Sequence, residues 1–291
     1  MRPLKIIVLA KQVPDTRNVG PDAMKPDGTV NRGKLPTIFN PDDLHALEMA
    51  LHIKDRVAGS KVTVLTMGPK KAADIIREGY YRGADDGIMI SDRRFGGADT
   101  LATSYTLVKA IEKISDFDLI LGGRQAIDGD TAQVGPQCAD KLKIPQVTYV
   151  EEIVSISEDE IVAKRRLSKG VETISSPYPC LMTIHGAAPA CRSRHAKNVM
   201  KFKYARTKTE MRSTNELIDM VHEKRPHLTI PEWSVEDIDA DVNKIGLPGS
   251  PTKVKSVENI VLTANESKVI SSSDADIEMM IKELIAHHTI G

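Results

Sequence analysis

The sequence has little of the cysteine and aromatic content that several common classes of protein need. Only three of its 291 residues are cysteines, and they are too far apart to form a Cys-x-x-Cys pair. We therefore expect neither a zinc site nor a disulfide framework, and we infer a reducing cytoplasm as the location. Aromatic residues make up only 4% of the chain, which argues against a surface that stacks nucleic-acid bases.

The chain also lacks an excess of one charge and a long apolar run. Lys and Arg together number 40, as do Asp and Glu, so the formal net charge is zero. Binding along a nucleic-acid backbone needs a basic excess, so nucleic acid is not an expected partner. No apolar run approaches the roughly 20 residues that span a bilayer. The short run Leu4–Ala10 is followed by Lys11, and we expect a first strand there, not a signal peptide.

The familiar signatures of nucleotide-binding and hydrolytic enzymes are absent too. No Gly-x-Gly-x-x-Gly follows the first apolar run, and neither Gly-x-x-x-x-Gly-Lys-Ser/Thr nor Gly-x-Ser-x-Gly occurs. The loop Gly96–Thr100 is similar to the Gly-Gly-x-Asp-Ser loop of ATP pyrophosphatases, but it follows a later strand, so we interpret Asp99 as a helix cap. The sequence predicts no acid–base, nucleophilic or metal-binding residue, and we expect His185 to be a satisfied core residue.

Apolar runs alternate with helical patterns over the first two-thirds of the chain. Strands are predicted over Leu4–Ala10, Lys61–Met67, Gly87–Ser91 and Phe117–Gly122, each rich in Ile, Val or Leu. Helices are predicted over 40–57, with Asn40 as N-cap and Pro41 in the first turn, over 69–81 and over 100–114. This alternation favours an α/β fold with a doubly wound, mostly parallel sheet that binds ligands at the carboxyl ends of its strands.

The pattern changes after about residue 146. Strands predicted over 147–157, 161–167, 171–175 and 180–185 suggest an antiparallel meander on the edge of the sheet. A Pro-Asp-Gly turn predicts a small hairpin over Lys25–Thr29. The polar, proline-punctuated region beyond Pro189 is expected to be extended and not self-packing. A helix is predicted over Asp274–His288, with an apolar stripe that would dock onto a partner chain.

The most informative stretch is Gly122–Gln137, which follows the predicted strand that starts at Phe117. Here the chain leaves a buried strand at glycines and enters a helix, which we expect over Thr131–Lys141. Such a junction presents free backbone N–H groups and the positive end of a helix dipole, and these bind phosphate.

Individual residues of this stretch allow two interpretations. Gly129 would let the backbone approach a ligand closely, and Thr131 and Gln133 would add neutral donors. In the other interpretation the stretch is an ordinary strand–helix turn that is capped by Asp128 or Asp130. The residues alone leave both open.

The chain resembles the beta, or small, subunit of electron transfer flavoproteins over roughly residues 1–215. The resemblance rests on Ala-Lys-Gln-Val-Pro-Asp at 10–15, on Asn40-Pro41 at a helix start, and above all on Gln-Ala-Ile-Asp-Gly-Asp-Thr-Ala-Gln-Val-Gly at 125–135. The stretches 164–172 and 179–183 match as well, although Lys169 stands where an acidic residue or glycine is usual.

This resemblance implies a division of the chain and a partner. Residues 1–188 would form a Rossmann-like, adenine nucleotide hydrolase-like domain that binds a nucleotide. Residues 189–291 would hold a partner-recognition loop and an extended C-terminal arm that packs on a larger, flavin-bearing alpha subunit. The protein would then be a heterodimer.

The family pattern also implies which residues line an adenine nucleotide site. Respiratory members hold AMP there, whereas members from anaerobes hold a second FAD that accepts electrons from NADH. The implied positions are Ala10, Asn40, Pro41, Asp42, Asp43, Met67, Asp128, Gly129, Asp130, Thr131, Ala132, Gln133, Val134, Gly135, Pro136 and Gln137. Arg124 is a candidate for tuning a flavin by its fixed positive charge, the alternative being a phosphate or interface salt bridge.

Several features resemble the electron-bifurcating, FAD-binding type from anaerobes. Gly129 stands where respiratory members tend to carry a third acid, and with Ala132 it removes bulk and negative charge from the turn. A flavin diphosphate is larger and more highly charged than a monophosphate, so this change favours FAD. The stretch 92–100 and the extension beyond residue 215 also resemble this type.

NADH and the protein partners are expected at two other places. We expect Arg93, Phe95 and Gly96–Gly97 to lie near NADH, the alternative being a plain surface loop. The segment Pro189–Met200 matches the family's partner-recognition loop, with Ala196 where respiratory members place a leucine anchor. Without that apolar side chain, the partner, an acyl-CoA-type or hydroxy-acid dehydrogenase, is expected to dock differently.

These observations lead to one main hypothesis and two alternatives. In the main one the chain is an electron-transfer subunit of an NADH-dependent oxidoreductase complex. It binds FAD, accepts electrons from NADH and, with the alpha subunit, passes them by bifurcation to a dehydrogenase and to a low-potential carrier such as ferredoxin. The flavin does the chemistry, and the protein sets its position and potential. The alternatives are a non-bifurcating carrier with AMP as structural ligand, and a stand-alone nucleotide-binding or ATP-cleaving module.

Overall fold

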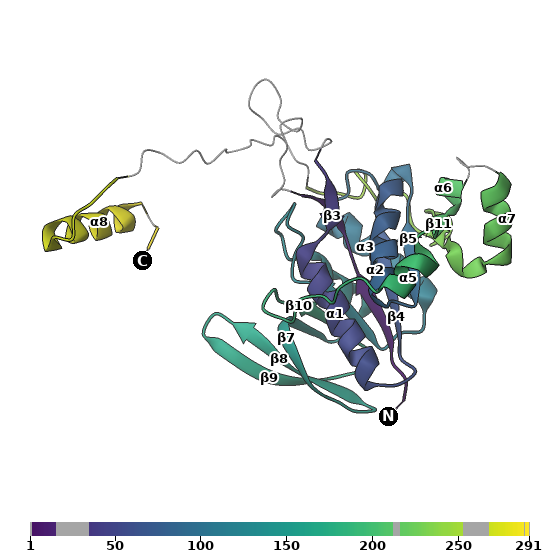
Figure 1. The fold of residues 1–291 in the computed structure, drawn as a ribbon, viewed down its shortest axis with the longest axis horizontal. Helices are drawn as coiled ribbons and strands as arrows, with labels where there is room; N and C mark the ends of the chain where they lie inside the picture. Colours follow the sequence, from purple (N-terminus) through teal and green to yellow (C-terminus); the bar gives the residue numbers. More distant parts are fainter. Residues whose placement is uncertain (1, 16–34, 212–215, 253–267, 288, 291) are drawn as a thin grey trace, which may run out of the picture. The chain divides into compact units, whose positions relative to one another are not determined.

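The computed structural model describes residues 2–15, 35–211, 216–252, 268–287 and 289–290 (Figure 1). The chain forms two compact units, 1–255 and 256–291. The larger unit contains a sheet with helices around it. In its described part, the smaller unit contains one helix.

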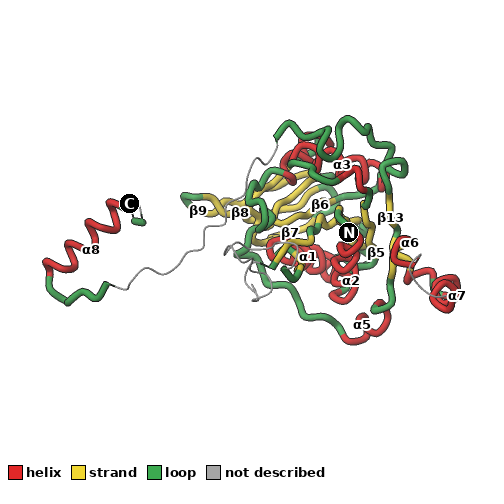
Figure 2. Tube along the Cα trace, turned by 90° about the horizontal axis from the view of Figure 1, so that it is seen from above, coloured by secondary structure: helices red, strands yellow, loops and turns green. Residues whose placement is uncertain are grey.

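The centre of the larger unit is a mixed sheet (Figure 2). Within the described residues it has nine strands in the order β13-β5-β4-β1-β6-β10-β7-β8-β9. The strands of its parallel part are β1 (Lys5–Leu9), β4 (Lys61–Met67), β5 (Asp86–Ile90), β6 (Leu119–Gly123) and β10 (Cys180–Ile184). The antiparallel edge consists of β7 (Gln146–Ile156), β8 (Glu160–Leu167) and β9 (Gly170–Pro177).

Helices cover both faces of the parallel strands (Figure 2). They are α1 (Pro41–Arg56) and α2 (Ala73–Arg82) on one face, and α3 (Thr100–Ile114) and α4 (Val134–Leu142) on the other. Alternate residues of β1 therefore enter two separate buried clusters, Ile6 on the α1 side and Ile7 on the α3 side. The predicted doubly wound, mostly parallel α/β fold is confirmed, because apolar side chains on both faces of a strand need helices on both sides.

Two predicted helices begin where the sequence places them. Helix α1 starts at Pro41, with Asn40 at the N-cap position, and α3 spans its predicted range. The Asp99 carboxylate accepts hydrogen bonds from the N–H groups of Leu101 (2.9 Å) and Ala102 (3.0 Å), so this predicted cap is confirmed. The Asn40 side chain makes no cap hydrogen bond, because it is used elsewhere in the crevice described below.

Helix α4 begins later than predicted. The sequence pattern predicts its start at Thr131, but the helix begins at Val134. Asp130 and Ala132 have positive φ angles of 50° and 54°, and left-handed residues cannot belong to a right-handed helix. The expected boundary was therefore wrong by three residues, and the segment before the helix is a bend.

Strand β10 lies in a different place from the one predicted. The sequence pattern makes it the last strand of the antiparallel meander, but it lies between β6 and β7 and pairs parallel with both. All five of its residues are buried, which is typical of a central strand. The meander itself, β7-β8-β9, is confirmed.

The segment 226–250 packs more closely than expected. Its strand β13 (Glu232–Trp233) extends the sheet beside β5, and the side chains of Val235, Ile238 and Ile245 are buried in the core. The apolar residues between the prolines and acids of this segment thus anchor it in the core. The expectation that the segment is extended and not self-packing was wrong here. Phe95 lies in the same buried cluster.

Shorter elements complete the larger unit. Strands β2 (Gln12–Pro14) and β3 (Thr37–Phe39) pair antiparallel, and β11 (Arg206–Thr207) pairs with β12 (Thr229–Ile230). Short helices are η3 (Lys70–Ala72), η4 (Arg93–Phe95), α5 (Ala196–Phe202), α6 (Lys208–Met211), α7 (Glu216–Lys224) and η5 (Pro226–Leu228). Segment η3 leads into α2, so the helix predicted over 69–81 has a 3-10 first turn. The hairpin predicted over Lys25–Thr29 lies outside the described residues.

The smaller unit contains α8 (Asp274–Ala286). The Ser273 side chain caps it by accepting a hydrogen bond from the Asp276 N–H. Its apolar stripe is exposed, with Ile281 at 41% and Ile285 at 51%. Neither this helix nor any other in the described ranges is long and apolar enough to cross a bilayer.

Candidate functional site

The topology places a switch point at the carboxyl ends of β1 and β6, and we call this edge of the sheet the crevice. Strand β1 pairs with β4 on one side and with β6 on the other. The chain builds outward from β1 through β4 and β5, then crosses to the opposite side for β6. Ligands in doubly wound sheets bind at such a switch point. Ala10 and Met67, two of the predicted positions, lie at the ends of β1 and β4.

The first turn of α1 holds the two strand ends together. The Asp43 carboxylate accepts a hydrogen bond from the Lys11 N–H at 2.8 Å and another from the Gly123 N–H at 2.9 Å. Lys11 follows β1, and Gly123 ends β6. A single buried carboxylate therefore links both sides of the crevice.

Burial changes the acidity of this carboxyl group. Desolvation raises the pKa of Asp43 to about 7, against the opposing effect of the hydrogen bonds from Lys11, Asn40 and Gly123. The neighbouring Asp42 carboxylate adds to the rise. The charge of the crevice therefore changes near neutral pH.

Asn40 positions the turn that follows β6. Its Nδ2 donates to the Gln125 carbonyl oxygen (2.8 Å), and its Oδ1 accepts from the Ile127 N–H (3.2 Å). The predicted capping residue thus spans from α1 to the informative stretch. Two opposed hydrogen bonds from one buried amide fix the orientation of that turn.

The bend after this turn uses some of the amides expected to bind phosphate. The N–H groups of Gly129 (3.2 Å) and Asp130 (2.9 Å) both donate to the Ala126 carbonyl oxygen. These two amides are therefore engaged within the turn, although free N–H groups were expected throughout this strand–helix junction. A Cβ added to Gly129 would meet no described atom within 4 Å, so the space beside this residue is open.

The next amides form a bend whose geometry could bind an anion. In the described part of the chain, the N–H groups of Thr131, Ala132 and Gln133 have no acceptor. Ala132 is left-handed and Gln133 is right-handed, with φ −103° and ψ −27°. Successive N–H groups in alternating left- and right-handed conformations converge on one point and bind anions. The first amides of α4, at Val134 and Gly135, extend this row with the helix dipole behind it.

The side chains of two predicted residues face elsewhere. Gln133 Oε1 accepts a hydrogen bond from Thr100 Oγ1 (3.0 Å), and Gln137 Oε1 accepts one from Ser104 Oγ (2.9 Å). Both glutamines thus tie α4 to α3 through their side-chain oxygens. The amide Nε2 of Gln133 is a separate donor, so the expectation that this side chain donates to a ligand stays a prediction.

Arg124 lies on the β7 side of the crevice. Its Nε is 3.7 Å from Asp42 Oδ2, and its guanidinium carbon is 6.0 Å from the centre of the Tyr149 ring. Among the described residues, neither the Nε nor the Oδ2 atom has a hydrogen-bond partner. These atoms could therefore be bridged by a polar group of a ligand or of another chain.

Comparison with known proteins decides the family. The model of the electron transfer flavoprotein domain matches residues 27–209. The electron transfer flavoprotein subunit beta of Clostridium acetobutylicum is 39% identical over 284 residues, which cover 98% of this chain and 96% of the relative. The chain belongs to the electron transfer flavoprotein family.

Two further relatives are subunits of reductase systems. The caffeyl-CoA reductase-Etf complex subunit CarD of Acetobacterium woodii is 43% identical over 251 residues, 86% of each chain. The acryloyl-CoA reductase electron transfer subunit gamma of Anaerotignum propionicum is 53% identical over 182 residues, 62% of this chain and 67% of the relative. The resemblance to electron transfer flavoprotein beta subunits is confirmed, and an electron-transfer subunit is the function common to these names.

In this electron transfer flavoprotein the structure also places Lys11 at the candidate site, a residue outside the set expected from the sequence. Lys11 Nζ contacts both carboxylate oxygens of Asp128, at 2.7 and 2.8 Å. Its signal in the sequence was its position directly after the first strand, at the predicted ligand-binding edge. A lysine at that edge can reach the turn after the neighbouring parallel strand.

One part of the expected NADH site is not available to a ligand. Phe95 is only 6% exposed and packs in the core. A Cβ added to Gly97 would lie 3.3 Å from the Leu247 side chain, whereas Gly97 itself is exposed. Phe95 therefore has little surface for a direct contact, whereas Arg93 is exposed, and the expectation that these residues lie near NADH stays a prediction.

Proposed function

We propose that this electron transfer flavoprotein subunit binds FAD with its phosphates on the main-chain amides of 131–135. The observation that carries the proposal is the row of N–H groups at the left-handed to right-handed bend before α4. Non-glycine residues adopt positive φ at a cost in free energy, and such conformations cluster at ligand sites.

In this proposal the residues of the crevice position a nucleotide and do not act as acids or bases. Asn40 and Asp43 fix the turn and both strand ends, while the amides after Asp130 would hold the phosphates. Bound FAD would supply the capacity to take up and release electrons, and the chain would set its place and surroundings. In our proposal the electrons come from NADH and pass, with the alpha subunit, by bifurcation to a dehydrogenase and to a carrier such as ferredoxin.

The small residues of the turn favour FAD over AMP. Gly129 adjoins open space, and Ala132 adds only a methyl group to the bend. Both leave room beside the amides for a second phosphate. AMP, held as a structural ligand by a non-bifurcating carrier, is the alternative.

Identifying the bound nucleotide tests this proposal. The complex of this chain with its alpha subunit should release a second FAD, beyond that of the alpha subunit, when it is denatured and its ligands are separated by chromatography. Recovery of AMP in place of the second FAD would favour the alternative. Recovery of neither would contradict a nucleotide site in this subunit.

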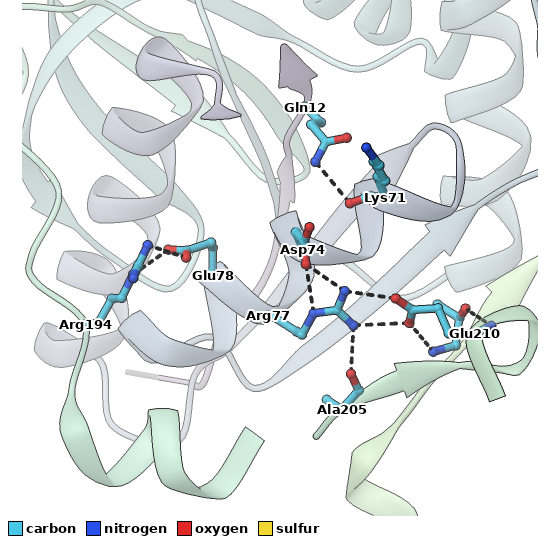
Figure 3. A network of polar contacts seen from close by, with 9 residues as sticks. Gln12, Lys71, Asp74, Arg77, Glu78, Arg194, Ala205 and Glu210 are labelled. Atoms are coloured by element: carbon cyan, nitrogen blue, oxygen red, sulfur yellow. Dashed lines mark hydrogen bonds and ion pairs between the residues drawn. The ribbon is translucent and has the colours of Figure 1, made fainter. Parts of the chain in front are cut away.

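We further propose that the segment 189–211 carries the surface for the dehydrogenase partner. Ion pairs hold this segment against α1 and α2: Arg192 pairs with Glu48 (2.9 Å) and Arg194 with Glu78 (2.6 Å). Figure 3 shows Arg194 and Glu78 beside a second anchor, in which Arg77 contacts Glu210 at 2.9 Å. A network of this kind restricts a segment more than isolated surface pairs do.

Helix α5, between these anchors, presents a basic outer face. Phe202 is buried, and its ring stacks on Tyr80 with centroids 4.6 Å apart. The opposite side exposes Met200 (64%) and carries Lys197, and the exposed Lys201 lies with its Nζ 4.6 Å from the centre of the Phe202 ring. The sequence contains no Asp or Glu from 173 to 209. This face therefore suits a partner with an acidic surface around an apolar contact.

Reversing one charge on α5 should selectively weaken binding of the dehydrogenase partner. We expect Lys201→Glu to raise the KM for an acyl-CoA-type dehydrogenase about tenfold at low ionic strength, with a smaller effect at high salt. Lys143→Glu, on the exposed end of α4, is the matched control and should have little effect. Equal effects of both variants would contradict a specific surface on α5.

The C-terminal arm is proposed to contact the alpha subunit. The exposed isoleucines of α8 form an apolar stripe that an isolated helix would leave in water. A cytoplasmic location also remains part of the proposal, since the three cysteines are free.

A further inference from the structure

Lys11 is held by its main chain, and its side chain extends to an ion pair with Asp128. Its N–H donates to the buried Asp43 carboxylate (2.8 Å), and its carbonyl oxygen accepts from the Asn40 N–H (3.0 Å). The side chain is 48% exposed and ends at the Asp128 carboxylate, which is 26% exposed. A flexible four-carbon stem on a fixed backbone can exchange one anion for another without rearranging the fold.

The bend itself carries negative charge where a phosphate would bind. Asp128 and Asp130 both lie within three residues of the first free amide. The Asp130 carboxylate accepts a hydrogen bond from a neutral donor, Gln125 Nε2, at 2.8 Å. Within the described residues, Lys11 places its ammonium group at this turn, whereas Arg124 lies beside Asp42 and Tyr149 on the β7 side.

We propose that Lys11 is a phosphate-binding residue of the nucleotide site, and that Asp128 holds its ammonium group at the bend until the nucleotide arrives. This inference rests on the proposed nucleotide site and adds a residue outside the expected set. Phosphate oxygens compete with the Asp128 carboxylate for the same ammonium group. Lys11 then favours binding, and the charge of Asp128 opposes it.

The experiment compares ligands with and without phosphate. The complex with the alpha subunit, dialysed free of nucleotide, is titrated calorimetrically with adenosine, AMP and ADP. Lys11→Met should weaken AMP and ADP binding about tenfold and leave adenosine unchanged. Asp128→Asn should instead tighten AMP and ADP binding severalfold, since it removes a like charge and frees the ammonium group.

Controls distinguish a binding role from a structural one. Lys11→Arg keeps the charge and should retain most of the AMP affinity, while Lys61→Met, at the opposite end of the sheet, should change nothing. If Lys11 only clamps the turn, Lys11→Met and Asp128→Asn will weaken all three ligands by similar factors, and the inference is overturned. If the unaltered complex binds neither AMP nor ADP, the proposed nucleotide site fails as well.

Discussion

Replacing Gly123 by alanine should destabilise the protein strongly and weaken nucleotide binding at the same time. An added Cβ would lie 2.5 Å from Asp43 Oδ1 and 2.6 Å from the Asp42 carbonyl carbon. The second atom is backbone, so the start of α1 must move. Overpacking of this kind costs about 1–3 kcal/mol. Disturbing the hydrogen bonds of a buried carboxylate adds about 1–3 kcal/mol more.

Urea denaturation and thermal melting measure this loss. A decrease of about 3 kcal/mol in the free energy of unfolding corresponds to a fall in Tm of roughly 5 °C for a chain of this size. Calorimetric titration with AMP should show weaker binding, because the same contact joins α1 to both sides of the crevice.

Gly129→Ala is the matched comparison. Its added methyl group would meet no described atom within 4 Å, and its φ is not positive. We expect stability to change by less than about 0.5 kcal/mol. Nucleotide affinity should nevertheless fall, since the methyl group enters the open space beside the amides. Equal losses of stability in both variants would contradict the tight packing at Gly123.

The sequence predicted the scaffold well because periodicity reflects burial. Strand β4 and helix α3 have their predicted bounds. Both are long segments in which one pattern of apolar residues dominates. The order of the strands could not be predicted in this way, because β10 would be equally apolar at any buried position in the sheet. Its place between β6 and β7 depends on contacts between distant residues, which local patterns do not contain.

The sequence predicted where a row of main-chain amides lies, but only part of its hydrogen bonding. The glycine-rich stretch after β6 does end in a row of main-chain amides, yet Gly129 and Asp130 use theirs internally. Likewise, Asn40 occupies the predicted N-cap position, but its side chain spans to Gln125 and Ile127. Side-chain partners so far apart in the chain follow from the packed structure and not from spacing along the sequence.

The free energy of unfolding should fall as pH rises from about 4 to about 7, because of Asp43. Burial raises the pKa of this carboxyl from 3.8 to about 7 in the native state. Between these values the native protein binds a proton that the unfolded chain has released. The unfolded state thus binds fewer protons, so this stabilisation is complete below about pH 4 and is lost by about pH 7.

Asp43→Asn isolates this contribution, because an amide does not titrate. The variant should be less stable than the native sequence, since its Nδ2 group faces one of the two N–H donors. Its deficit should shrink by about 1.4 kcal/mol for each pH unit within this window. The pKa values of Asp92 and Glu236 are lowered to about 2, and they affect stability at lower pH. Their effect is the same in the variant and in the native sequence, so it cancels when the two stabilities are subtracted. Parallel curves from pH 4 to 8 would mean that Asp43 is ionised throughout. In that case the crevice would carry a fixed negative charge between the strand ends, and Lys11 would have a second carboxylate to offset.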